Sequence, residues 1–390
     1  MPKNNFKWQL INDSITESDK EAWTNFINTP NQRFTQGEKV KEFENNWSEW
    51  LGVKYSVFVN SGASANYIMT SIMKEIHGLG EVIVSPLGWV SDVSPLVNLG
   101  FTPVFVDVSM ENMSITFDNI KSAITDKTVG VCLVHVLGFN AITDELVKYC
   151  KDHDLFLIED CCESHGAKHD GQKVGTFGDV SNFSFYFGHH ITTIEGGMVC
   201  TNDDEIYDYA KLFRSHGMTR EASTEMQQDY QERYPDLNPL FTFAVPGYNM
   251  RNQEMNAVLG ISQLKRLDYN SEKRSINFET WVNCLNPLKY NVGFERNGNS
   301  NFSLPLIVLD SDKDLFKRVC DYLDSEDVEY RVGTAGGGNQ ARQPYLIPYK
   351  IIKHDLGNVD YIHEYGLYVG NHPELEENEI INLCDGLNLL

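Results

Sequence analysis

The feature that most constrains the fold is an alternation of short apolar runs with helix-sized spacers between residues 55 and 201. Seven runs rich in β-branched and aromatic residues follow one another: YSVFVN, EVIVSP, FTPVFVDV, VGVCLVHV, LFLIED, VSNFSFYF and GMVCT. Strands separated by helix-length spacers are typical of crossover connections in a largely parallel sheet that helices cover on both faces. The sequence therefore predicts an α/β domain with ligands at the carboxyl ends of its strands.

The pattern changes after residues 247–267, which as a whole read as a helix. Strand-like runs at 301–309 and 328–332, with helix-like segments at 312–325 and 374–390, predict a smaller α+β domain. We place the boundary near residue 265, giving a large domain of 1–265 and a small domain of 266–390. The polar, turn-rich segment 219–239 is predicted to be a surface excursion of the large domain.

The balance of charge excludes several partners. Asp and Glu total 55 against 32 Lys and Arg, a net charge of −23, which disfavours nucleic acids and anionic membranes. The first twenty residues lack the apolar core of a signal peptide and no 18-residue apolar run occurs, so we expect a cytoplasmic protein. Eight cysteines without a C-x-x-C pair predict reduced thiols, with no metal site and no iron–sulfur cluster.

A first candidate site is the segment VNSGASANYIM, where Gly62, Ala63 and Ser64 lie between a predicted strand and a predicted helix. Small residues let backbone N–H groups approach an anion, and a helix N-terminus adds partial positive charge. Taken alone, the segment more often forms a tight turn in which a serine caps the helix.

Two further segments carry ionisable groups. In LFLIEDCCESHGA, Asp160 closes an apolar strand, where a carboxylate could pair with the protonated ring nitrogen of a pyridoxal cofactor or merely cap a turn. His165 is either a site residue or a polar edge residue. In SNFSFYFGHHITTIEGGMVCT, His189 and His190 precede a glycine pair, and a histidine alone more often satisfies a local hydrogen bond than catalyses.

In this order and spacing, these segments resemble the sugar aminotransferases that use pyridoxal phosphate (PLP) and have the type I PLP-dependent transferase fold. The family signature ending in E-G-G corresponds to residues 184–197, and His189 occupies the position of its lysine. An aminotransferase needs that primary amine to hold the cofactor as a Schiff base, which imidazole cannot form. Imidazole can transfer protons near neutral pH, so the resemblance implies an untethered cofactor and a histidine acid/base.

Within the family, the whole chain is similar to the sugar 3-dehydratases of the colitose pathway. The similarity rests on HHITTIEGG, Trp89, residues 243–249, 329–331 and 366–372. It implies removal of the C3 hydroxyl of GDP-4-keto-6-deoxymannose, giving GDP-4-keto-3,6-dideoxymannose. L-Glutamate would convert PLP to pyridoxamine phosphate (PMP), and 2-oxoglutarate and ammonia would be released.

The resemblance also assigns roles to single residues. His189 is the expected acid/base, while His216 and Arg331 are expected to line the substrate pocket, with Arg331 as a partner for the glutamate carboxylate. Expected cofactor-binding residues are Gly62, Ala63, Trp89, Asp160, Glu163, Ser184 and, from the neighbouring subunit of a homodimer, Asn249.

Some alternatives stay open at this point. The nucleotide could be CDP or dTDP, because the loops that would read it carry no clear signal. The chain could also be a catalytically inactive aminotransferase-like binding protein. The glycine-rich stretch 333–338 departs from the family pattern and is either a substrate loop or a mobile connection.

Overall fold

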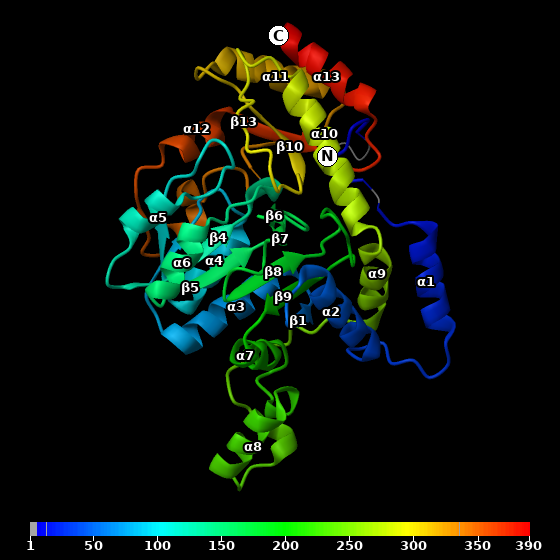
Figure 1. The fold of residues 1–390 in the computed structure, drawn as a ribbon, viewed down its shortest axis with the longest axis vertical. Helices are drawn as coiled ribbons and strands as arrows, with labels where there is room; N and C mark the ends of the chain where they lie inside the picture. Colours follow the sequence, from blue (N-terminus) through cyan, green and yellow to red (C-terminus); the bar gives the residue numbers. More distant parts are fainter. Residues whose placement is uncertain (1–5, 13, 335) are drawn as a thin grey trace.

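The computed structural model describes residues 6–12, 14–334 and 336–390 and contains two main sheets (Figure 1). The larger sheet has eight strands in the order β1-β9-β8-β5-β4-β2-β3-β12. Its strands are β1 Tyr55–Val59, β2 Glu81–Val84, β3 Thr102–Phe105, β4 Thr128–Val134, β5 Phe156–Asp160, β8 Val180–Ser184, β9 Gly197–Thr201 and β12 Ile352–Lys353.

The pairing confirms the predicted fold class. Neighbouring strands from β12 through β3, β2, β4 and β5 to β8 are all parallel, and only β9 runs antiparallel to its neighbours β8 and β1. All five residues of β5 and of β8 are buried, as expected for strands covered on both faces. The carboxyl ends of β1, β2, β4, β5 and β8 consequently meet at one edge of the sheet.

The helices that follow the early strands pack back on the sheet. Helix α3 contacts β1, β5, β8 and β9, while α4 contacts β2 and β3. The helices are α1 Glu17–Asn28, α2 Glu38–Leu51, α3 Gly62–His77, α4 Val90–Leu99, α5 Phe117–Ala123, α6 Asp144–Asp152, α7 Asp204–Arg214, α8 Thr224–Arg233, α9 Glu254–Leu264, α10 Leu267–Cys284, α11 Lys313–Ser325, α12 Gly357–Tyr365 and α13 Glu377–Leu389.

A second sheet is built from the C-terminal third of the chain. It has the order β10-β13-β11, with β10 Ser303–Ile307, β11 Tyr330–Val332 and β13 Gly366–Gly370, all antiparallel. The N-terminal segment lies against it, because Trp8 pairs with Val328 and donates its indole N–H to the Gly370 carbonyl at 2.9 Å. Strand β12, from the C-terminal third, joins the large sheet, while the N-terminal segment packs on the small sheet. The predicted domains therefore exchange segments, and the boundary near residue 265 stays a prediction.

One predicted element is wrong in part. Within residues 247–267, helix α9 covers only Glu254–Leu264, and helix α10 begins at Leu267. Residues 247–253 are not helical. Residues before α9 run extended because tertiary contacts hold them: Arg251 pairs with Val59, and the Asn252 amide donates to the Val59 carbonyl at 2.8 Å. These contacts outweigh the local helix propensity.

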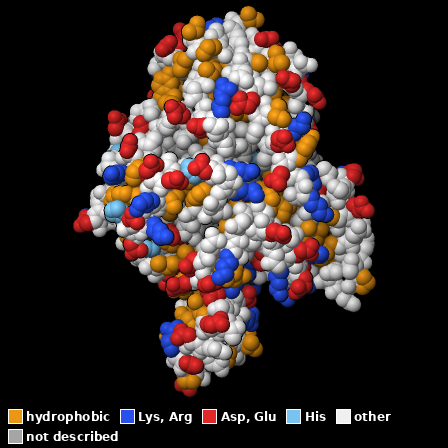
Figure 2. Space-filling model, in the orientation of Figure 1, with side chains coloured by type: hydrophobic (Ala, Val, Ile, Leu, Met, Phe, Trp, Pro, Cys, Tyr) orange, Lys and Arg blue, Asp and Glu red, His pale blue; other side chains and the backbone are white. Residues whose placement is uncertain are grey.

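The excursion at 219–239 projects from the body below α7 (Figure 1) and contains α8, none of whose residues is buried. A short hairpin, β6 Lys168–His169 with β7 Gln172–Lys173, completes the described strands. No helix among the described residues is both long and apolar enough to cross a bilayer. Acidic side chains are scattered over the face in Figure 2 rather than gathered in one patch.

Candidate active site

A cavity of about 370 Å³ opens at the carboxyl ends of the parallel strands, between the two sheets. The large sheet contributes its floor, residues of β10, β11 and β13 contribute a wall, and the N-terminal segment contributes Leu10 and Ile11. Eight of the residues singled out from the sequence line it: Gly62, Ala63, Trp89, Asp160, Glu163, Ser184, His189 and Arg331.

The loop between β1 and α3 forms one end of the cavity. Ser61 caps α3, because its hydroxyl accepts the Ser64 N–H at 3.0 Å. This cap does not conflict with anion binding by the same turn. Gly62 packs tightly: a Cβ there would lie 2.7 Å from the Ser184 Cβ and 3.1 Å from the Cys162 sulfur. Only glycine allows this close approach, which leaves the helix N-terminus open towards the cavity, where it favours an anion.

Asp160 ends β5 at the cavity floor. Its carboxylate accepts hydrogen bonds from the Asn66 amide at 2.8 Å, the Asn182 amide at 3.3 Å and the Cys162 N–H at 2.9 Å. Asn66 also donates to Asp92 at 3.3 Å. Burial and the neighbouring Asp160 raise the pKa of Asp92 well above its usual value. Burial beside a second carboxyl group therefore favours the neutral form of Asp92.

The adjacent Glu159 belongs to the scaffold. Its carboxylate accepts N–H groups from Gly175, Phe177 and Gly178 at 2.7–2.8 Å and faces the His135 imidazole at 3.3 Å. Although burial favours the neutral acid, the His135 and backbone hydrogen bonds lower the pKa of Glu159 below its usual range. Both carboxylate oxygens of Glu159 are thus occupied by hydrogen bonds that hold the 175–178 loop against the sheet.

Trp89 precedes α4 and remains 49% exposed while lining the cavity. The glycine-rich stretch after Arg331 packs behind it: the Thr334 hydroxyl donates to the Leu87 carbonyl at 2.7 Å, and the Gln340 N–H to the Pro86 carbonyl at 2.8 Å. The described part of this stretch is thus anchored to the loop that carries Trp89.

Glu163 and Arg331 lie on the small-sheet side. One Glu163 oxygen accepts the Leu137 N–H at 2.7 Å, and burial, offset in part by Arg331, raises the pKa of Glu163 to about 7. Arg331 on β11 donates to the Tyr368 hydroxyl at 3.4 Å and is otherwise open. Its guanidinium is available to pair with a carboxylate.

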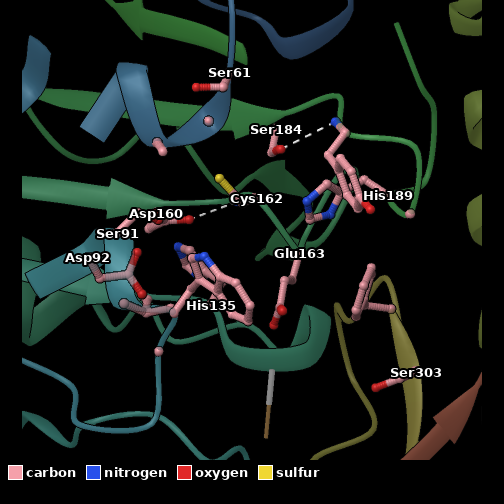
Figure 3. A pocket seen from close by; sticks show the side chains of 18 of the residues that line it. Ser61, Ser91, Asp92, His135, Asp160, Cys162, Glu163, Ser184, His189 and Ser303 are labelled. Carbon is pink, nitrogen blue, oxygen red and sulfur yellow. Dashed lines mark hydrogen bonds between the residues drawn. The ribbon is translucent and has the colours of Figure 1, made fainter. Parts of the chain in front are cut away.

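The His189 ring lines the cavity, and Figure 3 draws it on the side opposite Asp160. Its backbone is fixed by a turn in which the His189 N–H donates to the Tyr186 carbonyl at 3.0 Å. Burial, reinforced by the positive charge of Arg274, lowers the pKa of His189 to about 4 despite the opposing effect of Asp160. At neutral pH the ring is an uncharged imidazole that can accept a proton.

Two predicted residues do not line this cavity. His216 is not among the residues that line the cavity of its own chain: its N–H donates to the Tyr248 carbonyl at 2.6 Å beyond the end of α7, and its expected place in a substrate pocket stays a prediction. Ser215 pairs with Asn249, so His216 and Asn249 lie on one ribbon outside the cavity. The role of Asn249 in a neighbouring subunit stays a prediction.

Sequence reasoning missed the groups that position Asp160 and close the cavity. Asn66 on α3 and Asp92 on α4 are buried polar residues inside helices, which is the signal that could have found them. Phe302, Ser303 and Tyr368 come from the small sheet and carry no local signature. Among the described residues, the lining set contains no lysine.

The sequence pattern of the DegT/DnrJ/EryC1/StrS aminotransferase family matches residues 13–388. The chain is 32% identical over 389 residues, 98% of both chains, to a GDP-4-keto-6-deoxy-D-mannose 3-dehydratase of Yersinia pseudotuberculosis. A protein of the same name from Escherichia coli O55:H7 is 32% identical over 87% of this chain and 89% of its own.

Solved structures agree with these similarities. An E. coli GDP-4-keto-6-deoxy-D-mannose-3-dehydratase with bound hydrated PLP superimposes with a TM-score of 0.89 at 30% identity, over 98% of this chain and 99% of its own. A GDP-4-keto-6-deoxymannose-3-dehydratase with a trapped PLP-glutamate geminal diamine gives the same TM-score and identity, over 98% of this chain and 100% of its own.

Proposed function

The chain belongs to the DegT/DnrJ/EryC1/StrS aminotransferase family, and we propose that it is a PLP-dependent sugar 3-dehydratase. Its substrate is GDP-4-keto-6-deoxymannose, and its product is GDP-4-keto-3,6-dideoxymannose. L-Glutamate is the amino donor, and 2-oxoglutarate and ammonia are released. The single observation that carries this proposal is a cavity lined by His189 and, among the described residues, by no lysine. The relatives named as 3-dehydratases support it.

The cavity suits PLP and its aminated form, PMP. We propose that the Asp160 carboxylate would pair with the ring nitrogen and that the exposed indole face of Trp89 would stack on the ring. The N-terminus of α3 and Ser184 would bind the phosphate. Support comes from the three donors that fix Asp160 and from the close packing of Gly62 on Ser184. When bound, the cofactor supplies an electron sink for breaking bonds at neighbouring carbons.

His189 moves the protons in this proposal. Its uncharged ring accepts a proton from carbon at the nitrogen that faces the cavity, holds it away from bulk water and delivers it to the next acceptor. In the sugar half of the cycle, that acceptor is the oxygen of the departing C3 hydroxyl. Arg331 would hold the glutamate carboxylate in the other half, since its fork is open to the cavity. Glu163 would hold the cofactor from the small-sheet side.

We also propose a homodimer in which each site takes Asn249 from the other subunit, with His216 beside it. The ribbon that carries both residues lies outside the cavity of its own chain. Several large apolar side chains at the end of the neighbouring excursion and just after it are exposed, as expected of a surface that another copy covers: Leu237, Leu240, Phe241 and Phe243. Eight free cysteines suit the reducing cytoplasm, where we place the reaction.

The decisive experiment incubates the protein with PLP, glutamate and GDP-4-keto-6-deoxymannose and identifies the sugar product by mass. Loss of one oxygen without gain of nitrogen supports dehydration, whereas gain of an amine contradicts it. CDP- and dTDP-linked 4-keto sugars belong in the same assay, since one relative from Saccharopolyspora spinosa is named as a dTDP-sugar 3-dehydratase.

The variant His189→Asn should lose both the glutamate and the sugar half-reactions while still binding PLP. Absorbance separates these effects, because glutamate should convert the PLP spectrum to that of PMP only in the unmodified protein. A half-reaction retained in the variant would exclude His189 as the base. An unmodified protein that binds PLP without any spectral response to glutamate would be an inactive homologue.

A further inference from the structure

His165 is the least expected polar side chain in the interior. The residue follows β5 and is fully buried, and neither ring nitrogen makes a well-formed hydrogen bond with the described residues, although the Ser184 backbone acts on the ring as a weak acceptor. Aromatic rings surround it, with centroids at 5.4 Å for Phe183 and 5.8 Å for Trp47 and Phe185. A phenylalanine would fill this space without burying two ring nitrogens that lack well-formed hydrogen bonds, so packing alone does not account for an imidazole.

The ring lies directly behind the proposed base. Its centroid is 6.0 Å from that of His189 and 5.1 Å from that of His190. The Nδ1 atom of His189 is buried without a partner, while the same ring lines the cavity. His189 and His165 are thus neighbouring buried imidazoles, and a ring spacing of 6.0 Å is one that an ordered water, or a small rotation of either ring, would bridge.

Other buried polar atoms gather at the same place. His190 directs Nε2 to the Ser300 carbonyl at 3.1 Å, which leaves its Nδ1 unpaired. The hydroxyls of Ser164, Ser300 and Ser303 are likewise buried without partners among the described residues. A buried cluster of donors and acceptors of this kind is the usual setting for ordered water in proteins.

Burial, with a cation nearby, disfavours positive charge on the histidines of this cluster. Arg274 donates to the Phe302 carbonyl at 3.0 Å and to the Asn371 carbonyl, and the opposite charge that acts on it is that of Glu374. Burial lowers the pKa of His165, His189 and His190, and the charge of Arg274 adds to the effect. His189 therefore carries a single N–H, and whichever nitrogen bears it decides whether the cavity-facing nitrogen is a base.

We propose that His165 is a positioning residue for His189: it accepts the Nδ1–H of His189, directly or through one ordered water, and leaves Nε2 free towards the cavity. The inference rests on the proposed function, in which His189 is the base. When Nε2 accepts a proton from carbon, Nδ1 keeps its own proton, and its bond to His165 becomes charge-assisted. No proton passes to His165, because burial and the charge that His189 gains disfavour a second charge there.

The first test reads the tautomer. Nitrogen-15 NMR of the full chain with labelled histidine, with and without PLP, distinguishes a protonated Nδ1 from a protonated Nε2, and His189→Asn assigns the signal. We expect Nδ1–H in the unmodified protein, and Nε2–H would overturn the proposal. This result does not depend on sugar turnover, so the proposed function can fail separately in the product assay.

The second test separates positioning from packing. His165→Phe should keep PLP affinity and the KM for glutamate but lower kcat of the glutamate half-reaction about ten- to a hundred-fold, the range for partners that orient a reactive group. His165→Asn and His165→Gln each place an amide near one of the two ring-nitrogen positions, and the matching variant should recover most of kcat.

The matched control is Phe183→Leu, which loosens the same aromatic box without removing a polar group. It should lower thermal stability and leave kcat of the glutamate half-reaction unchanged. Full kcat in His165→Phe, or an equal loss of kcat in Phe183→Leu, would overturn the proposal. If His165→Phe does not fold, the tautomer in the unmodified protein decides the question.

Discussion

At the scale of single residues, the identity of position 189 determines whether the cofactor can be tethered. His189→Lys places a primary amine in a cavity that has none among its described lining residues. We expect borohydride treatment of the PLP-loaded variant to leave a pyridoxyl group attached to the chain, while dehydration falls at least a hundred-fold, the lower end of the contribution of a general acid/base. Mass spectrometry of the reduced protein gives the first result and sugar product analysis the second.

The unmodified protein is the control for that experiment. Pyridoxyl attached to the unmodified chain after borohydride would contradict the untethered arrangement. An unchanged dehydration rate in His189→Lys would contradict the role of the imidazole.

Glu163 gives a prediction about pH. Its pKa is about 7 in the folded chain and near its usual 4.5 when unfolded, so between these values the folded state binds more protons. Stability therefore falls as pH rises through this window, by about 3 kcal/mol in total. Glu163→Gln removes this contribution, because the amide does not titrate.

The measurement is urea unfolding of the cofactor-free protein at several pH values. The stability of Glu163→Gln relative to the unmodified chain should rise from pH 4.5 to pH 7 and level off above. Parallel stability curves for the two proteins would show that Glu163 is not titrating in this window.

At the scale of secondary-structure elements, the contact between α3 and β8 depends on Gly62. A methyl group at that position would meet Ser184 at 2.7 Å, so Gly62→Ala must push the helix N-terminus away from the strand. We expect a loss of about 1–3 kcal/mol in stability from overpacking, and weaker PLP binding measured by absorbance titration. Gly357→Ala at the start of α12 is the control, since nothing lies within 4 Å of a Cβ there.

An element could be predicted from the sequence where its own residues determine its conformation. Strands such as β5 are runs of apolar residues, so composition alone locates them. Residues 247–253 take their shape from contacts with Val59, and β12 has only two residues, Ile352 and Lys353. Neither carries a local pattern, because partners distant in sequence determine both conformations.

The same division applies to the site. Asp160 and His189 stand in motifs that resemble a family signature, and both line the cavity. Asn66, Asp92 and Tyr368 contribute because the fold brings α3, α4 and β13 to one edge, which no spacing in the sequence encodes. For His216 and Asn249 the motif identifies the residues without saying which copy of the chain they serve.

At the scale of the whole molecule, the cavity is a composite of distant parts. The large sheet supplies Asp160 and Ser184, the small sheet supplies Tyr368, and the N-terminal segment supplies Leu10. Asn249 and His216 lie outside this cavity, and Asn249 follows exposed apolar side chains at and just after the end of the excursion. A closed two-fold pair would cover that surface and bring the same patch of each chain to its partner.

Mixing inactive variants tests this arrangement directly. Asn249→Ala and His189→Asn should each be strongly impaired alone as homodimers, the first because the phosphate loses a contact and the second because the base is gone. After dissociation and random re-association of equal amounts, half of the dimers are mixed, and each mixed dimer holds one complete site, so about a quarter of all sites should be intact. If both residues serve the site of their own chain, every site stays defective and the mixture stays inactive.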